Sequence, residues 1–322
     1  MKKALWLKYF KNEKITSYKK LKGGVSSEVY KIKTSKNIYC IKRSLKKLLV
    51  KKDWYADTSR IKYEYLWLKH CKNFIPNSVP KLYYYNDKEK YFSLEYFDER
   101  KFRTLKELFF KRLINKDVIK KISLDLQTIH LKSANIPTKK IFSNNNKNFY
   151  DLRLDAYFNE IGRVHVNLQN HVRLINKNYY KFSTTLVHGD FSPKNILVNN
   201  KTIKIIDAET CNFGDPVFDL VFFTNHLLIK SLIIPEIKEK LLESYLYFYN
   251  IYFSNLKNNE IESYLKRIIK MTPIMLLARV DGKSPVEYIH KKNIKDKIRQ
   301  KSMQLINTRI KNLKDIVKII ND

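Results

Sequence analysis

The sequence lacks the features that mark membrane proteins, secreted proteins and proteins with cysteine-based metal sites. No apolar run approaches the ~18 residues of a membrane span, and residues 1–10 have too short an apolar stretch for a secretory signal. The three cysteines, Cys40, Cys71 and Cys211, show no metal-ligand spacing, and their odd number disfavours a disulfide framework. We therefore expect a cytoplasmic protein with no membrane partner.

Acidic residues are also scarce. The chain has 31 Asp and Glu against 64 Lys and Arg, which gives a formal net charge of +33. Such an excess can mark a nucleic-acid-binding protein. However, 52 of the 64 basic residues are lysines spread over the whole chain, and no basic cluster lies within a nucleic-acid-binding motif. We therefore expect no specific nucleic-acid partner, although the charge should attract small anions.

Glycine is rare as well, with six residues in a chain of 322. Five of the six fall in short polar segments, namely the pair at 23–24, HGD at 188–190, GDP at 214–216 and DGK at 281–283. Glycine permits backbone conformations and close approaches that other residues do not. These segments are therefore the first places to look for functional turns.

One of these segments and a short run that follows it carry the strongest chemical signal. Residues 186–196 read LVHGDFSPKNI, and residues 205–209 read IIDAE. The β-rich runs on either side of an Asn-Asn turn predict a hairpin, which would let Asn195 and Asp207 face one cation. Mg²⁺ accepts an amide oxygen and a carboxylate together with phosphate oxygens. With Asp190 to orient a hydroxyl, the set indicates phosphoryl transfer, although a lone HGD segment is often an ordinary turn.

The first segment resembles the catalytic loop of protein kinases, in which the same Asp and Asn are separated by four residues. Protein kinases carry arginine where this chain has Gly189, and GDPVFDL follows at 214–220. Both features resemble the aminoglycoside phosphotransferase and choline kinase family of small-molecule kinases. The resemblance implies an α+β, two-lobed protein-kinase-like fold, with a small β-rich N-lobe over 1–97 and a larger, mainly helical C-lobe over 98–322.

The same resemblance implies ATP and Mg²⁺ as cofactors and a role for each motif residue. Asp190 would be the catalytic base, and Asp219 would brace the catalytic loop through its backbone. His188 would hold the loop without exchanging protons. The Mg²⁺ ligands would be Asn195 and Asp207, with Glu209 as a possible further ligand.

Residues 21–45 predict a hairpin whose first turn is rich in glycine. Lys42 ends its second run, and by the resemblance it pairs with the nucleotide phosphates. Glycine lets backbone amides approach a phosphate closely. The phosphate-binding turn would comprise Gly23, Gly24, Ser26 and Ser27, although a simple turn at the Gly-Gly pair is the alternative.

Residues 57–71 then predict a helix. Glu64 lies in its middle, and the resemblance pairs it with Lys42, although a solvated helix carboxylate is the alternative. A second hairpin over 82–97 leads to the hinge between the lobes. There, by the resemblance, the backbone around Glu95 to Phe97 would hydrogen-bond the adenine.

From about residue 98 the pattern turns helical. The polar segment 138–150 is predicted to be a loop, and 151–180 to be a helical pair or one long helix. His165 and His171, six residues apart, suit no helical metal site and are expected at the surface. Further helices are predicted near 105–113, 118–130, 236–257, 259–278 and 290–320.

The segment LARVDGKSPVEYI at 277–289 forms a dense polar turn between two of these helices. It resembles a late segment in some bacterial members of the family. Arg279 or Asp281 could reach the cleft between the lobes, and a plain helix-to-helix connection explains both residues equally well. The sequence leaves the two interpretations open.

The function expected from the whole set is ATP-dependent transfer of the γ-phosphoryl group to a hydroxyl of a small molecule, such as a sugar, an amino alcohol or an aminoglycoside. Aminoglycosides are polycations, so a strongly cationic chain favours a neutral or anionic acceptor. Two alternatives stay open. One is a catalytically inactive nucleotide-binding pseudokinase acting as a scaffold, and the other is a charge-driven nucleic-acid-binding protein.

Overall fold

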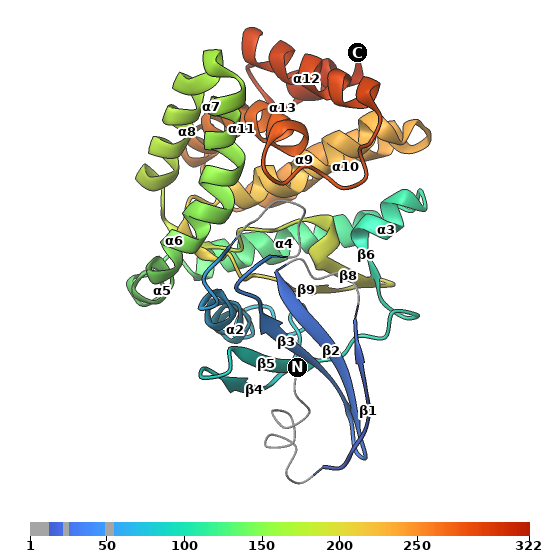
Figure 1. Cartoon of the computed structure of the whole chain (residues 1–322). Helices are drawn as coiled ribbons and strands as arrows, with labels where there is room; N and C mark the ends of the chain where they lie inside the picture. The colour runs from blue at the N-terminus through green and yellow to red at the C-terminus, as the bar shows by residue number, and fades with distance from the viewer. Residues whose placement is uncertain (1–12, 22–25, 49–54) are drawn as a thin grey trace.

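The computed structural model of the chain describes residues 13–21, 26–48 and 55–322. In Figure 1 a β-rich lobe lies below a larger, mainly helical lobe. This arrangement confirms the predicted α+β class with two unequal lobes. The exact ranges predicted for the lobes remain a prediction.

Five antiparallel strands form the N-terminal sheet in the order β1-β2-β3-β5-β4. Both predicted hairpins are present, but the first strand was not predicted. Its sequence, ITSYKK, is mostly exposed and shows no buried alternation, and its lysines suit a sheet edge. The strands are β1 (Ile15–Lys20), β2 (Ser27–Thr34), β3 (Ile38–Ser44), β4 (Leu82–Asn86) and β5 (Tyr91–Glu95).

The alternation of side chains along β3 separates the two faces of this sheet. Tyr39 and Ile41 join a small buried cluster on one face. Cys40 and Lys42 therefore point to the opposite face, where helix α2 (Arg60–Cys71) contacts β3. The helix begins three residues later than predicted because Asp57 accepts a hydrogen bond from the Ser59 amide at 2.8 Å and forms a turn there.

The C-terminal lobe is built around four long helices that pack on one another, α4, α9, α10 and α11. Helix α9 is buried over nearly its whole length and was not predicted. Its sequence is apolar on all sides, so it lacks the one-sided stripe that marks a surface helix. The helices are α3 (Leu105–Phe110), α4 (Lys116–Lys132), α9 (Val217–Ile233), α10 (Lys238–Phe253), α11 (Asn258–Asp281), α12 (Lys292–Asn307) and α13 (Leu313–Asn321).

The predicted loop over 138–150 is wrong, because this segment is helical. Helices α5 (Ile136–Phe142) and α6 (Asn146–Phe149) are joined by a short 3₁₀ turn. Asn135 caps α5 by accepting the Thr138 amide at 2.9 Å, and Phe142 and Phe149 are buried. Two aromatic anchors and a cap therefore outweigh the low helix propensity of the asparagine-rich sequence.

The helical pair predicted over 151–180 is confirmed. Its first arm is a π-helical stretch, η2 (Tyr150–Asn159), that continues into α7 (Glu160–Val164). Its second arm is α8 (Gln169–Lys181). In Figure 1 the two arms stand side by side at one edge of the helical lobe.

Two small sheets lie near the junction of the lobes. Strands β7 (Thr185–Val187) and β10 (Asn212–Gly214) pair with each other, and β8 (Ile196–Asn199) lies between β6 (Arg103–Thr104) and β9 (Thr202–Ile205). The predicted hairpin around the Asn-Asn turn is thus present. Within the described ranges, no helix is both long and apolar enough to cross a membrane.

Gly214 offers a test of this packing. A Cβ atom at this position would meet the Tyr179 hydroxyl at 1.9 Å, and that hydroxyl is buried and donates to Asn212 at 2.7 Å. We expect Gly214→Ala to lower the free energy of unfolding by about 1–3 kcal/mol, measured by urea denaturation.

Gly162→Ala is the matched control. A Cβ atom at Gly162 would meet its nearest neighbours at 3.7 Å, an ordinary contact, and the residue is helical. This change should raise the free energy of unfolding by about 0.5–1 kcal/mol. Equal effects of the two substitutions would contradict the packing described around Gly214.

Candidate active site

The loop that carries His188, Gly189 and Asp190 joins β7 to β8 and is held by one carboxylate. Asp219, on the first turn of α9, is fully buried. Its Oδ2 accepts the His188 amide at 2.6 Å and its Oδ1 accepts the Gly189 amide at 2.9 Å. A carboxylate with two backbone donors fixes the loop strongly, because charge-assisted hydrogen bonds exceed neutral ones in strength.

Gly189 has the one conformation in this loop that demands glycine. Its φ is +77°, and a Cβ atom would meet the Thr210 carbonyl oxygen at 2.5 Å. The positive φ and the close approach together exclude a side chain.

His188 is a buried structural link in the same loop. Its Nδ1 accepts the Asp190 amide at 3.1 Å, so its Nε2 donates to the Ile206 carbonyl at 3.1 Å. Burial lowers the pKa of His188, which matches a neutral ring that holds two backbone segments.

Asn195 and Asp207 are brought together by the β8–β9 hairpin. The Asn195 carbonyl accepts the Ile206 amide at 3.0 Å, which places Asp207 beside the start of β8. The Asn195 amide nitrogen donates to the Asp190 carbonyl at 2.9 Å, so its oxygen is the atom left for a cation. Asp207 has a φ of +69°, a costly conformation that functional sites often hold.

Lys42 joins these C-lobe residues to the N-terminal lobe. Its Nζ contacts Glu64 Oε2 at 2.7 Å and also pairs with Asp207 Oδ1. Glu64 is only 2% exposed, which excludes the alternative of a solvated helix carboxylate. Burial opposes the charge on Lys42, but the Asp207 and Glu64 carboxylates more than offset it and raise the lysine's pKa.

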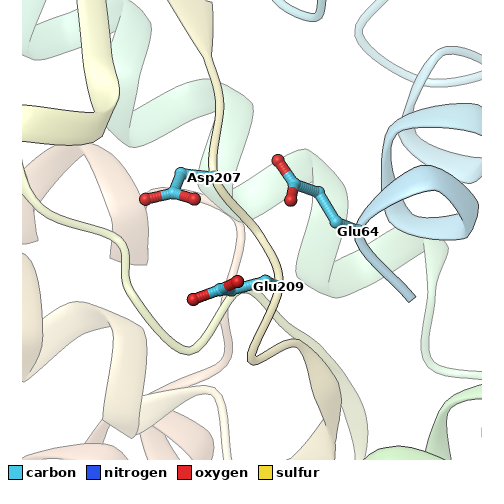
Figure 2. Close-up of side chains that lie close together, drawn as sticks. All are labelled: Glu64, Asp207 and Glu209. Carbon is cyan, nitrogen blue, oxygen red and sulfur yellow. The ribbon is translucent and has the colours of Figure 1, made fainter. Parts of the chain in front are cut away.

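Three carboxylates converge beside that lysine. Figure 2 shows Glu64, Asp207 and Glu209 turned toward one space, and one oxygen of each lies within 4.8 Å of the others. Burial raises the pKa of Glu64 to about 7, against the pull of Lys42, whereas Lys42 and Lys194 hold the pKa of Asp207 below its usual range despite burial. Carboxylate and amide oxygens are the hard ligands that Mg²⁺ prefers, so the donor set fits that ion.

Arg60 is a residue that sequence reasoning missed. It is fully buried, and its Nε donates to Glu209 Oε2 at 3.0 Å. The other guanidinium nitrogens donate to the carbonyls of Ser26, Leu45, Ala56 and Asp57. In the sequence Arg60 looks like any basic residue at the start of a helix. Its partners Glu209, Ser26 and Leu45 are remote in sequence, so no local pattern predicts the contacts.

Two cations that were also missed flank Asp190. Its Oδ2 lies 3.0 Å from Lys194 Nζ and 3.4 Å from an Arg153 nitrogen. Arg153 also donates from Nε to the Gly189 carbonyl. Lys194 stands in the PKN segment of the motif, where its spacing of four from Asp190 was a usable signal. Arg153 comes from η2 and had none.

The remaining predicted nucleotide-binding residues lie along the N-terminal sheet. Ser27 is buried at the start of β2, and Ser26 offers its carbonyl to Arg60. Glu95 ends β5 opposite Tyr39, and the Phe97 ring lies 4.9 Å from that of Phe102. Their contact with a nucleotide remains a prediction. Gly23 and Gly24 lie outside the described residues.

The sequence left two interpretations of the polar turn at 277–289 open, a position in the cleft between the lobes or a helix-to-helix connection. Asp281 is bound to Arg299 at 2.6 Å and to His165 at 2.9 Å, so it joins helices. His171 is exposed, as expected, whereas His165 is partly exposed and its ring is held by Asp281. Arg279 donates to the Ser284 carbonyl of the turn at 2.7 Å and to the Tyr157 hydroxyl at 2.6 Å, so it holds the connection and also contacts the helix that carries Arg153.

Comparison with known families agrees with this geometry. Residues 144–249 match the model of the phosphotransferase enzyme family. The matched range contains the whole catalytic loop and the Asp207 and Asp219 segments. The match confirms the predicted resemblance to this family and the predicted phosphotransferase class. Among curated proteins, none matches the chain.

Solved structures agree in fold over nearly the whole chain. An amicoumacin kinase bound to AMP-PNP and Ca²⁺ is similar with a TM-score of 0.57 and 14% identity, over 94% of each chain. A spectinomycin phosphotransferase bound to ADP and spectinomycin is similar at 0.53 and 16%, over 100% of this chain and 99% of that one. A choline/ethanolamine kinase family protein from Mesorhizobium loti is similar at 0.52 and 12%, over 94% and 92%. These likenesses confirm the predicted kinase-like fold.

Arg60 provides a test of how the site is held. We expect Arg60→Lys to lower the free energy of unfolding by at least about 2 kcal/mol, because lysine keeps the charge but cannot reach the same set of buried acceptors. Urea denaturation measures the change. Arg173→Lys, at an exposed position of α8, should be neutral; a tolerated Arg60→Lys would show that the guanidinium fork is dispensable.

Proposed function

We propose that the chain transfers the γ-phosphoryl group of ATP to a hydroxyl group of a small molecule. The observation that carries the proposal is the convergence of Lys42, Asp190, Asn195 and Asp207 at the junction of the two lobes. These residues come from β3, the catalytic loop and the segment after β9. The family match over the catalytic segment supports the same reaction class.

In this reaction Asp190 receives the proton of the acceptor hydroxyl. The hydroxyl oxygen forms the new bond to the γ-phosphorus, the bond from that phosphorus to the bridging oxygen breaks, and ADP leaves with the electron pair. Asp190 is held for this task by its own backbone, since its amide is bound by His188 and its carbonyl by Asn195. Catalysis of this kind depends mainly on positioning and electrostatic stabilisation.

Lys42 supplies a fixed positive charge for the nucleotide phosphates, oriented by Glu64 as described above. Asp207 and the Asn195 amide oxygen would hold Mg²⁺, with Glu209 as a further ligand. The ion would neutralise charge on the phosphate oxygens. The turn at Gly23, Gly24, Ser26 and Ser27 would cover the phosphates, and the backbone around Glu95 to Phe97 would bind the adenine.

The two alternatives are weaker on specific grounds. An inactive scaffold has no need for a lysine, a base and two metal ligands that are all retained in a fitting arrangement. A charge-driven nucleic-acid-binding protein needs a concentrated basic surface, whereas here the lysines are dispersed along the chain. The similar structures belong to kinases of antibiotics and to a choline/ethanolamine kinase family protein, which supports a small hydroxyl compound as the acceptor.

Asp190→Asn tests the proposed base. The change keeps the shape of the side chain but removes the proton acceptor, so kcat should fall by about 10²–10⁴-fold. Binding of AMP-PNP with Mg²⁺ should be unchanged. The measurement is ATP consumption across sugars, amino alcohols and aminoglycosides, paired with calorimetry of AMP-PNP binding. Full activity of this variant would refute the assignment of Asp190.

Asp207→Asn tests the metal site separately. It should remove most of the Mg²⁺ dependence of AMP-PNP binding, because a carboxylate ligand is lost. Asp151→Asn changes a half-exposed aspartate whose one ion pair within the described ranges is with Lys147; it is the matched control and should behave as the unchanged protein. Mg²⁺-dependent binding that survives in Asp207→Asn would contradict the proposed site.

A further inference from the structure

A second group of cations continues from Asp190 into the helical lobe. We call Lys194, Arg153, Arg279 and Lys230 the cation row. Lys194 and Arg153 contact the Asp190 carboxylate, as described above. The next two members follow through shared aromatic side chains, so the row begins at the proposed base.

Arg153 and Arg279 share the same two rings. The guanidinium carbon of Arg153 lies 5.6 Å from the centre of the Tyr157 ring and 5.7 Å from that of Phe222. The corresponding distances for Arg279 are 5.2 Å and 5.8 Å. Arg279 is 7% exposed, and its Nε is buried with no hydrogen-bond partner among the described residues. A buried donor without a partner is costly unless a ligand supplies one.

Lys230 is reached along one face of α9. Phe222, His226 and Lys230 are spaced by four residues, and the rings of Phe222 and His226 are 6.0 Å apart. His226 Nδ1 and Lys230 Nζ both bond the Tyr288 hydroxyl at 3.1 Å. Lys230 is fully buried, and no carboxylate of the described residues forms an ion pair with it.

The carboxylates around the row are already neutralised by other cations. Glu287, beside Tyr288, pairs with Lys106 at 2.7 Å. Asp155, on the same helix as Arg153, pairs with Lys283 at 2.8 Å and with Arg163. Asp190 is the acidic group that contacts the row itself. The row therefore carries more positive charge than its surroundings neutralise.

Titration of nearby groups agrees with that excess. Burial raises the pKa of Tyr157, but the guanidiniums of Arg279 and Arg153 bring it below the ordinary value. Burial and the charges of Lys230 and Arg279 lower the pKa of His226. Burial also lowers the pKa of Lys230 to about 7; Glu287 acts against this shift, and the charges of Lys106 and Arg279 add to it.

We propose that the hydroxyl acceptor carries an anionic group, a carboxylate or a phosphate, which the cation row binds while the hydroxyl lies at Asp190. This inference rests on the proposed function and names the chemical class of its acceptor. Arg279 and Lys230 bind the anion, because one has a free donor and the other lacks a counter-charge. Lys194 and Arg153 contact the Asp190 carboxylate at the other end of the row.

Matched acceptors test the inference. ATP consumption is measured with hexoses against their 6-phosphates and uronates, with glycerol against glycerol 3-phosphate, and with ethanolamine and kanamycin. The anionic member of a pair should have a kcat/KM about tenfold or more above that of the neutral member, the range of one charged hydrogen bond. Equal or better turnover of neutral or cationic acceptors would overturn the inference while leaving the kinase assignment intact.

Substitutions test whether Lys230 and Arg279 bind the anionic group of the acceptor. Lys230→Met and Arg279→Gln should each raise KM for the anionic acceptor about tenfold or more and leave KM for ATP unchanged. Lys266→Met is the control, since this lysine is largely exposed and, in the part of the chain that the structure describes, forms an ion pair with Glu262 alone. Unchanged acceptor KM in both row variants would overturn the inference. Binding of AMP-PNP with Mg²⁺ checks that each variant is folded.

If none of the tested acceptors is turned over, anion binding is measured directly. Sulfate is titrated against the protein saturated with AMP-PNP and Mg²⁺, and the melting temperature is followed. Sulfate should stabilise the unchanged protein and Lys266→Met more than Lys230→Met or Arg279→Gln. Equal shifts in all four proteins would overturn the inference, whereas failure of the proposed function alone would appear as loss of Mg²⁺-dependent AMP-PNP binding.

Discussion

The site depends on one buried ammonium group. Lys42 lies on β3, and its charge is balanced by Glu64 from α2 and by Asp207 from the segment after β9. A buried charge is tolerated only when its partners are in place, so this lysine fixes the strand, the helix and the C-terminal lobe relative to one another. Arg60 connects the two lobes in the same way, through its ion pair with Glu209. Both bridges from the N-terminal lobe end on the Asp-Ala-Glu segment at 207–209, the segment proposed to hold the metal ion.

A second constraint positions the proposed base. The loop at 188–195 is held by the side chains of His188 and Asn195 and by the buried carboxylate of Asp219. That carboxylate is carried by α9, the most deeply buried helix of the lobe. Hydrophobic burial fixes α9, and two charge-assisted hydrogen bonds from Asp219 fix the loop to that helix. His188 then links the loop to the strand that leads to Asp207. The proposed base and the proposed metal ligand are thus held by one connected set of bonds.

The parts of this site that could be predicted are those that lie close together in the sequence. Asp190, Asn195 and Asp207 fall within one loop and one hairpin, and the spacing alone brings them together. The Lys42–Glu64 pair could be predicted only through the resemblance. Arg60 and Arg153 could not be predicted at all, because a guanidinium is recognised by carbonyls and carboxylates from segments that the sequence does not place. The helical segment over 138–150 was missed for a related reason: its phenylalanines are buried by distant partners, whereas its local composition is typical of a loop.

The net charge of +33 and the cation row bear differently on the acceptor. Exposed lysines are screened by salt beyond about 8–10 Å, so the total charge attracts anions in general and selects none of them. Arg279 and Lys230 are buried, and burial makes an unbalanced charge expensive in a way that salt does not relieve. A neutral acceptor would leave that cost in place, and a polycationic acceptor would add to it. An anionic group lowers that cost by supplying the missing counter-charge, so under this proposal selectivity would come from two buried side chains and not from the overall charge.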